Sequence, residues 1–303
     1  MSHFSIAGLQ LELQRGSNFD AIADEVRSVR RRMPWLNMVV LPELCAFGPS
    51  PDFAETLPGW AEDAFAELAK ETGLWLVNGS LIEKTNSALF NTTTVFDPSG
   101  AVVARHRKLY PFRPYEAGIA AGDTPARFEV PGVGVFGIAI CFDIWFPEVS
   151  RTLAWSGVEV LINPSMTNTI DRDAETAIVR ATAAQNQLYV VSINIAGDLG
   201  VGQSLVVGPG GEVIHQAGRN REIIVTELDM EYLRRCRERG WHGLGQVLKS
   251  FRDGPQQFDV YANGPGQSPT LSGLGPLTMP EGAEPHLNNV TPMQSKRKKG
   301  GLS

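Results

Sequence analysis

Apolar runs of strand length alternate with stretches of helical periodicity along most of the 303-residue chain. In the first half of the sequence, these periods and the turn residues between them predict strands over 4–13, 37–41, 74–82, 91–96 and 101–105. One helix is predicted after Asn18, and a second from Pro58 to a stop at Gly73. The turn at 97–100 joins the last two strands as a hairpin.

The second half continues this alternation after a stretch without a clear period. Residues 110–132 are rich in Pro and Gly, which predicts a long ordered loop of the kind that often carries function. Strands are then predicted over 133–140, 158–162 and 188–194, helices over 147–156 and 173–187, and a hairpin turn at 208–211. Because strands joined by helices pair in parallel and hairpins pair antiparallel, the sequence predicts an α/β fold with mixed sheets.

The composition of the chain changes near residue 262. The segment 263–303 is rich in Gly, Pro, Ser and Asn, and it offers few apolar side chains to bury. Such a segment does not offset the entropy of ordering the chain. We therefore expect one folded domain over 1–262 and a tail over 263–303 that is flexible or wraps around another subunit.

Charge and cysteine content narrow the class of protein. Lys and Arg total 27 against 33 Asp and Glu, a net charge of −6 that argues against nucleic acid or an anionic membrane as a partner. No apolar stretch approaches the roughly 18 residues of a membrane helix, and we expect no targeting segment. The 3 Cys and 5 His lack the spacing of a disulfide framework or a metal site. We expect a cytoplasmic protein without a metal.

Cys141 is the leading candidate for chemistry because of its place in the predicted fold. It follows the apolar strand 133–140 and lies shortly before the helix predicted over 147–156. Sites of α/β proteins form where the carboxyl ends of strands meet helix amino termini, and the positive end of a helix dipole favours a thiolate. Taken alone, the residue also suits a buried and inert position.

Glu43 and Lys108 are predicted at the ends of two other strands, where each by itself also suits an ordinary surface position. Hydrolysis of an unreactive carbon–nitrogen bond needs a nucleophile, a base that later protonates the departing nitrogen, and a cation near the oxyanion. Cys141, Glu43 and Lys108 supply these groups in that order. The backbone N–H of Phe142 is expected to assist Lys108 at the oxyanion.

Three blocks of sequence carry a resemblance to a known family. They are LPEL at 41–44, RKLYPFRPYEAG at 107–118 and GIAICFDIWFPE at 137–148. In this order and spacing they are similar to the nitrilase superfamily of carbon–nitrogen hydrolases, and the resemblance covers about residues 4–260. It implies a four-layer α-β-β-α sandwich with two mixed β-sheets, a Cys-Glu-Lys triad, a thioester acyl-enzyme and no cofactor. It also implies a homodimer or a higher homo-oligomer.

The resemblance also indicates a further site residue and a branch of the family. Glu116 matches the second glutamate that the family places beside its lysine, where it orients the lysine and the substrate nitrogen. Phe142-Asp143 follows the cysteine, whereas true nitrilases usually have Trp-Glu there. Together with the short spacing from Lys108 to Glu116, this resembles the aliphatic amidases and formamidases, which implies hydrolysis of a small carboxamide to an acid and ammonia.

Side chains that flank the thiol are expected to select the acyl group. They are Phe112, Tyr115, Trp145 and Phe146 and, in the loop 164–168, Pro164, Ser165 and Met166. A pocket with aromatic walls favours apolar or flat acyl groups over ionic ones. Arg113 and Arg172 are the candidates for binding a substrate carboxylate.

Two other functions stay open from the sequence. The first is an N-carbamoyl amino acid or amine hydrolase, or a nitrilase, with the same Cys-Glu-Lys site. The second is a catalytically silent binding or regulatory subunit. The presence of Glu43, Lys108, Glu116 and Cys141 together argues against a silent subunit, because a protein without turnover has no physical need for all four.

Overall fold

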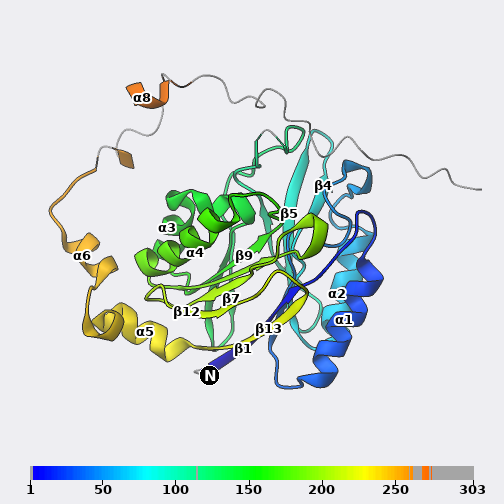
Figure 1. Ribbon diagram of the computed structural model, residues 1–303, viewed down its shortest axis with the longest axis horizontal. Coiled ribbons are helices and arrows are strands. Elements are labelled where there is room, and N and C mark those ends of the chain that lie inside the picture. Colours follow the sequence, from blue (N-terminus) through cyan, green and yellow to red (C-terminus); the bar gives the residue numbers. More distant parts are fainter. Residues whose placement is uncertain (1–2, 114, 259, 262–267, 273, 275–303) are drawn as a thin grey trace, which may run out of the picture.

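The computed structural model describes residues 3–113, 115–258, 260–261, 268–272 and 274 (Figure 1). Most of the tail expected over 263–303 lies outside the described residues. In the described part of the chain, no helix combines the length and the apolar character that crossing a membrane requires.

The first sheet has seven strands in the order β13-β1-β2-β3-β5-β4, and β6 pairs with β5. Its strands are β1 (His3–Gln10), β2 (Met38–Val40), β3 (Trp75–Val77), β4 (Leu81–Lys84), β5 (Leu89–Phe96), β6 (Val102–Arg107) and β13 (Glu222–Asp229). β1, β2 and β3 pair in parallel, whereas the pairs β1–β13, β3–β5, β4–β5 and β5–β6 are antiparallel. The sheet is therefore mixed, as predicted.

The second sheet has six strands in the order β12-β11-β10-β9-β8-β7. They are β7 (Arg127–Val130), β8 (Gly134–Ile138), β9 (Val160–Ser165), β10 (Tyr189–Asn194), β11 (Leu205–Val207) and β12 (Val213–Gln216). The central strands β8, β9 and β10 pair in parallel. The single strand β7 pairs antiparallel with β8 at one edge, and the hairpin β11–β12 pairs antiparallel with β10 at the other. This sheet is also mixed.

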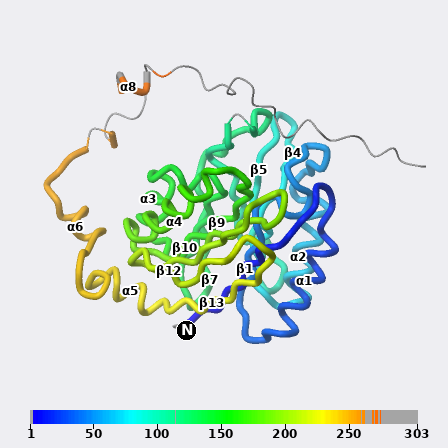
Figure 2. The backbone as a smooth tube through the Cα atoms, in the orientation of Figure 1, coloured from blue at the N-terminus to red at the C-terminus, as the bar shows by residue number. Residues whose placement is uncertain are grey.

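Helices cover the outer face of each sheet (Figure 1). α1 (Phe19–Arg32) and α2 (Trp60–Thr72) pack on the first sheet, and α3 (Pro147–Trp155) and α4 (Arg172–Asn186) pack on the second. After β13 the chain leaves the sandwich through α5 (Met230–Arg239) and α6 (Val247–Asp253), drawn yellow to orange in Figure 2. A short helix, α8 (Pro269–Ser272), lies further along.

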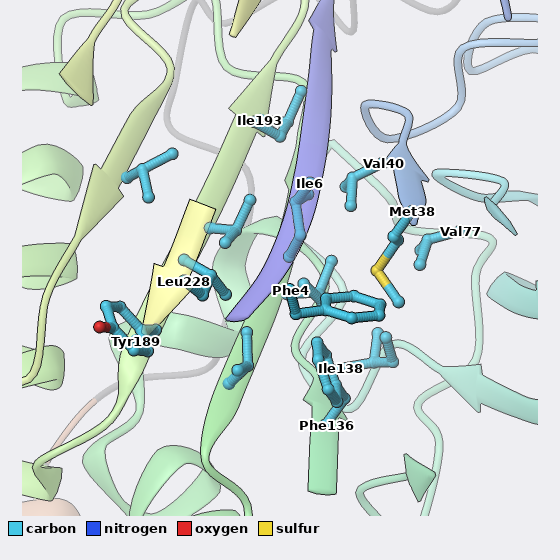
Figure 3. Close-up of a cluster of buried hydrophobic side chains, with 14 of the residues drawn as sticks. Phe4, Ile6, Met38, Val40, Val77, Phe136, Ile138, Tyr189, Ile193 and Leu228 are labelled. Atoms are coloured by element: carbon cyan, nitrogen blue, oxygen red, sulfur yellow. The ribbon is translucent and has the colours of Figure 1, made fainter. Parts of the chain in front are cut away.

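The two sheets face each other across a continuous apolar core (Figure 3). Because side chains alternate along a strand, Phe4 and Ile6 of β1 enter this core while Leu9 packs toward α1 and α2. Phe136 and Ile138 of β8 reach the same core from the second sheet. The predicted four-layer α-β-β-α sandwich with two mixed sheets is therefore confirmed.

Two predicted elements differ from the structure. The loop expected over 110–132 contains β7, a four-residue strand that pairs with β8. The strand expected over 74–82 is two strands, β3 and β4, because the chain turns at Gly79 with a φ of +75°. At that turn a side chain on residue 79 would fall on the carbonyl oxygen of Pro42, next to Glu43. The turn therefore lets the chain pass close behind the segment that carries Glu43.

Gly79→Ala is expected to unfold more readily than the wild-type protein. Gly73→Ala is the matched control, because Gly73 also has a positive φ of 63° but nothing lies within 4 Å of its missing side chain. The control should lose about 1 kcal/mol of unfolding free energy, and Gly79→Ala at least about 2 kcal/mol more, since the Pro42 backbone must move. Urea unfolding measures both, and equal losses would contradict the close approach.

Candidate active site

Residues from distant parts of the chain line one cavity of about 170 Å³. Glu43 follows β2, Lys108 follows β6, and Cys141 follows β8 after Ala139 and Ile140. The N–H of Glu43 donates to the carbonyl oxygen of Ser165 at the end of β9, at 3.3 Å, which joins the strand ends of the two sheets. The structure thus brings the candidate nucleophile, base and cation to one place.

The ammonium of Lys108 lies between two carboxylates. Its Nζ is 2.8 Å from Oε1 of Glu43 and 2.7 Å from Oε2 of Glu116. The side chains of Lys108 and Glu43 are only 2% and 3% exposed, and that of Glu116 is 15% exposed. The backbone N–H of Phe112 also donates to Glu116, which holds this carboxylate in place.

Cys141 occupies a tight turn between β8 and a 3-10 helix, η2 (Cys141–Trp145). Its φ of 44° lies in the left-handed region, which a non-glycine residue adopts only when its surroundings hold it there. The thiol Sγ is 3.6 Å from Oγ1 of Thr167. The N–H of Phe142, at the second position of this short helix, has no intrahelical partner by geometry. It therefore suits the oxyanion role predicted for it.

A buried hydrogen bond between His106 and Asp143 connects the cysteine turn to the lysine strand. Oδ2 of Asp143 lies 2.9 Å from Nε2 of His106 and accepts from the N–H of Ile140 at 3.0 Å. Its Oδ1 accepts from the N–H of Tyr110 at 2.8 Å. Because Nδ1 of His106 accepts from the N–H of Ala126, Nε2 carries the proton toward Asp143. These contacts fix the residues on both sides of Lys108 relative to Cys141.

Burial is the largest influence on the pKa values of Cys141 and Glu43, and it raises both. It raises the pKa of the Cys141 thiol well above its ordinary value, the charge of Glu43 adds to this, and Lys108 only partly opposes it. Burial and the charge of Glu43 therefore act against the thiolate that the helix dipole favours. Burial also raises the pKa of Glu43 against the opposing charge of Lys108.

For Lys108 and Glu116, neighbouring charges outweigh the effect of burial on the pKa. Burial by itself would lower the pKa of Lys108, but the charges of Glu116 and Glu43 raise it well above its ordinary value. For Glu116, burial is outweighed by the charge and hydrogen bond of Lys108, so its pKa is lowered. At neutral pH the site therefore holds a neutral thiol beside a charged lysine.

Some of the predicted pocket residues line the cavity and others do not. Phe112, Tyr115, Trp145 and Met166 line it. Phe146, Pro164 and Ser165 do not belong to its lining. The ring of Phe146 stacks on Tyr110 instead, whereas Pro164 and Ser165 are buried within β9 and Ser165 bonds to Asn163 and Glu175.

The two arginines considered for a substrate carboxylate bind the protein itself. Arg172 is buried and donates to Glu175 and to the carbonyl oxygen of Gln203. Arg113 donates to the carbonyl oxygens of Glu116 and Ile119. The arginine that lines the cavity is Arg15, beyond the end of β1. Its position past a strand end, like that of Glu43, is the signal that would have found it.

Asn91 is a further residue of the site that the sequence did not indicate. It lies in β5 with no exposed surface, and its Nδ2 donates to Oε1 of Glu43 at 2.8 Å and to Oε1 of Glu116 at 3.0 Å. Its neighbours Thr92, Thr93 and Thr94 are equally buried, so the pattern of the strand does not distinguish it. In the described part of the chain, no cluster of three His, Cys, Asp or Glu side chains is arranged to hold a metal ion.

Comparison with known proteins identifies the class. The family model described as carbon–nitrogen hydrolase matches residues 5–238. Omega-amidase NIT2 of Mus musculus is 31% identical over 260 residues, which covers 78% of this chain and 93% of the relative. Omega-amidase NIT2 of Homo sapiens is 30% identical over 284 residues, with 86% and 98% covered.

Solved structures agree with the sequence comparison. Saccharomyces cerevisiae Nit3, described as a member of branch 10 of the nitrilase superfamily, superposes with a TM-score of 0.73 at 27% identity, covering 78% of this chain and 94% of its own. The fold is thus that of the nitrilase superfamily. The chain belongs to the carbon–nitrogen hydrolase family, so the predicted resemblance and the assignment as an enzyme are confirmed.

Glu43 and Glu116 bind one ammonium but have pKa values shifted in opposite directions, which provides a matched pair of variants. A raised pKa means that the native state binds the proton more tightly than the unfolded chain, so ionised Glu43 lowers stability above its ordinary value of 4.5. At neutral pH the melting temperature of Glu43→Gln should equal or exceed that of the wild type. The difference in melting temperature should shrink as the pH falls to 4.5.

Glu116→Gln should have the opposite effect. Its lowered pKa contributes stability above the ordinary value that is lost as the pH falls, so the variant should lose about 1–3 kcal/mol at neutral pH. Calorimetry over about pH 4 to 8 measures both variants. If Glu43→Gln lost as much unfolding free energy at neutral pH as Glu116→Gln, the opposite directions of the two pKa shifts would be contradicted.

Proposed function

We propose that this protein hydrolyses a small linear carboxamide to a carboxylic acid and ammonia through a thioester on Cys141. The observation that carries the proposal is the ammonium of Lys108, 2.8 Å from Glu43 and 2.7 Å from Glu116, in the same cavity as the Cys141 thiol. These are the groups that amide hydrolysis needs.

In the first half-reaction, Sγ of Cys141 attacks the amide carbon while Glu43 takes the thiol proton. A neutral thiol with a raised pKa needs such a base, because little thiolate exists at neutral pH. The ammonium of Lys108 and the N–H of Phe142 stabilise the oxyanion of the tetrahedral intermediate. The carbon–nitrogen bond then breaks as Glu43 returns the proton to the nitrogen, and ammonia leaves.

In the second half-reaction, water replaces the nitrogen. Glu43 takes a proton from a water molecule, whose oxygen attacks the thioester carbon. The carbon–sulfur bond breaks, the carboxylic acid leaves, and the proton returns to Sγ of Cys141. Glu116 keeps Lys108 charged and oriented in both half-reactions, since its charge is the largest influence that raises the pKa of this lysine.

The names of the relatives and one cavity residue favour a narrower substrate class. The relatives from Mus musculus and Homo sapiens are named omega-amidases, which supports an amide at the end of a carbon chain. Arg15 on the cavity wall offers a positive charge to a carboxylate at the other end of such a chain. A monoamide of a dicarboxylic acid is therefore the second candidate substrate, beside a simple aliphatic amide.

We further propose a homo-oligomer that works in the cytoplasm, with the hydrolase domain over 1–262 and an appended tail. Trp155 at the end of α3 is 56% exposed and contacts the ring of Phe251 in α6, so an apolar surface lies on the outer helix layer. Such a surface suits contact with another copy. All three cysteines are free thiols, which suits a reducing compartment.

Cys141→Ala should abolish ammonia release from amides. The panel contains aliphatic amides, monoamides of dicarboxylic acids, nitriles and ureido acids, and ammonia is measured enzymatically. The wild type should release ammonia from the amides, and Cys141→Ala should lower that rate at least about 10³-fold, because the nucleophile is lost.

Cys45→Ala is the control for this experiment. Cys45 is also buried, but its thiol donates to the carbonyl oxygen of Asn78 at 3.4 Å, outside the cavity lining. Its rate should stay within about twofold of the wild type. Full activity of Cys141→Ala would refute the proposal, and ammonia released only from nitriles or ureido acids would replace the amide with those substrates.

A further inference from the structure

Asn91 contacts each of the three charged residues of the site. Its Nδ2 donates to Oε1 of Glu43 at 2.8 Å and to Oε1 of Glu116 at 3.0 Å. The backbone carbonyl oxygen of Asn91 accepts a hydrogen bond from the backbone N–H of Lys108 at 2.8 Å, which continues the β5–β6 pairing by one step. One fully buried residue thus connects the base, the lysine and the second glutamate.

The orientation of the Asn91 amide is set by the two carboxylates. Its Oδ1 is buried and has no hydrogen-bond partner among the described residues, whereas its Nδ2 has two. The reversed amide would point an oxygen at both carboxylates, which repels. The side chain therefore donates to both glutamates and leaves its own Oδ1 without a hydrogen bond in the described structure.

The hydrogen bonds distinguish the two oxygens of Glu43. Both Asn91 Nδ2 and Lys108 Nζ donate to Oε1, each at 2.8 Å. Within the described portion of the chain, no hydrogen bond to Oε2 is found, and a contact between the Glu43 carboxylate and Cys141 lowers the pKa of Glu43 against the larger effect of burial. Fixing Oε1 from two sides leaves Oε2 as the oxygen for proton transfer.

We propose that Asn91 is a positioning residue that fixes Glu43 through Oε1, so that Oε2 exchanges the proton with Cys141 and with the leaving nitrogen. Its second hydrogen bond, to Glu116, fixes the position of that carboxylate relative to Glu43 on the other side of Lys108. This inference rests on the proposed function, since it assigns Glu43 as the base. Asn91 itself does not line the cavity, and it acts through Glu43 and Glu116, which do.

The test compares Asn91→Ala and Asn91→Asp with the wild type over pH. Removing the donor disfavours the ionised form of Glu43, so more of the base is protonated at a given pH. For Asn91→Ala we expect kcat to fall at least about tenfold with KM within about threefold, and the acidic limb of kcat/KM to rise by about one pH unit. Asn91→Asp places a third carboxylate there and should move the limb further.

A matched control separates this role from a structural one. Asn186 near the end of α4 is also buried, donates through Nδ2 to the carbonyl oxygen of Thr182, and has an unpartnered Oδ1 in the described structure. It lies eleven residues along α4 from the cavity residue Glu175, or roughly 16 Å. Asn186→Asp should lower the melting temperature but leave the acidic limb in place.

A second readout does not depend on knowing the substrate. The rate at which iodoacetamide alkylates Cys141, followed by peptide mass spectrometry over pH, reports deprotonation of the thiol beside Glu43. Its pH profile should move in Asn91→Ala and not in Asn186→Asp. If Asn91→Ala fails to fold, Asn91→Ser, which keeps one hydroxyl donor, replaces it and should show a smaller shift.

The outcomes are distinct. A folded Asn91→Ala with wild-type kcat and unmoved pH profiles would overturn the inference and leave the proposed function standing. A lower kcat with an unmoved limb would also overturn it, because that result indicates general loosening of the site. A wild type that hydrolyses no amide would refute the proposed function, and the alkylation profiles would then still decide whether Asn91 controls Glu43.

Discussion

The site depends on one buried ammonium held between two carboxylates. Moving the Lys108 charge out of water is costly, and the pairing with Glu43 and Glu116 offsets that cost only while all three groups keep their geometry. Burial, and after it the charge of Glu43, raise the pKa of the nearby thiol, so the site keeps Cys141 protonated until a base removes its proton.

The sandwich supplies this geometry through strand ends. The parallel strands of both sheets end at the same rim, and the hydrogen bond between Glu43 and Ser165 joins the sheets there. Behind this rim, the apolar core between the sheets fixes β2 and β8, which carry the base and the nucleophile. The His106–Asp143 pair then sets the cysteine turn against the lysine strand. Local flexibility in any of these parts would separate groups that must lie within hydrogen-bond distance.

Much of this arrangement could be predicted from the sequence, and the rest depends on contacts that no local pattern reveals. Glu43, Lys108 and Cys141 were predicted together because each follows a predicted strand, and because the three supply the base, cation and nucleophile that carbon–nitrogen hydrolysis needs. β7 was missed because it is only four residues long in a stretch rich in Pro and Gly. Asn91 was missed because its partners lie 48 and 25 residues away in the chain. Phe146 was misplaced because its stacking on Tyr110 depends on tertiary structure.

The most direct test of the account is to capture the acyl group on the sulfur. The wild-type protein is mixed with an amide substrate, quenched in acid during the first turnover, and digested for peptide mass spectrometry. The account predicts an added acyl mass on the peptide that contains Cys141, released by hydroxylamine, and none on the peptides of Cys45 or Cys236. Ammonia release without any acyl mass on Cys141 under conditions where the thioester should accumulate, or an acyl group on another residue, would contradict it.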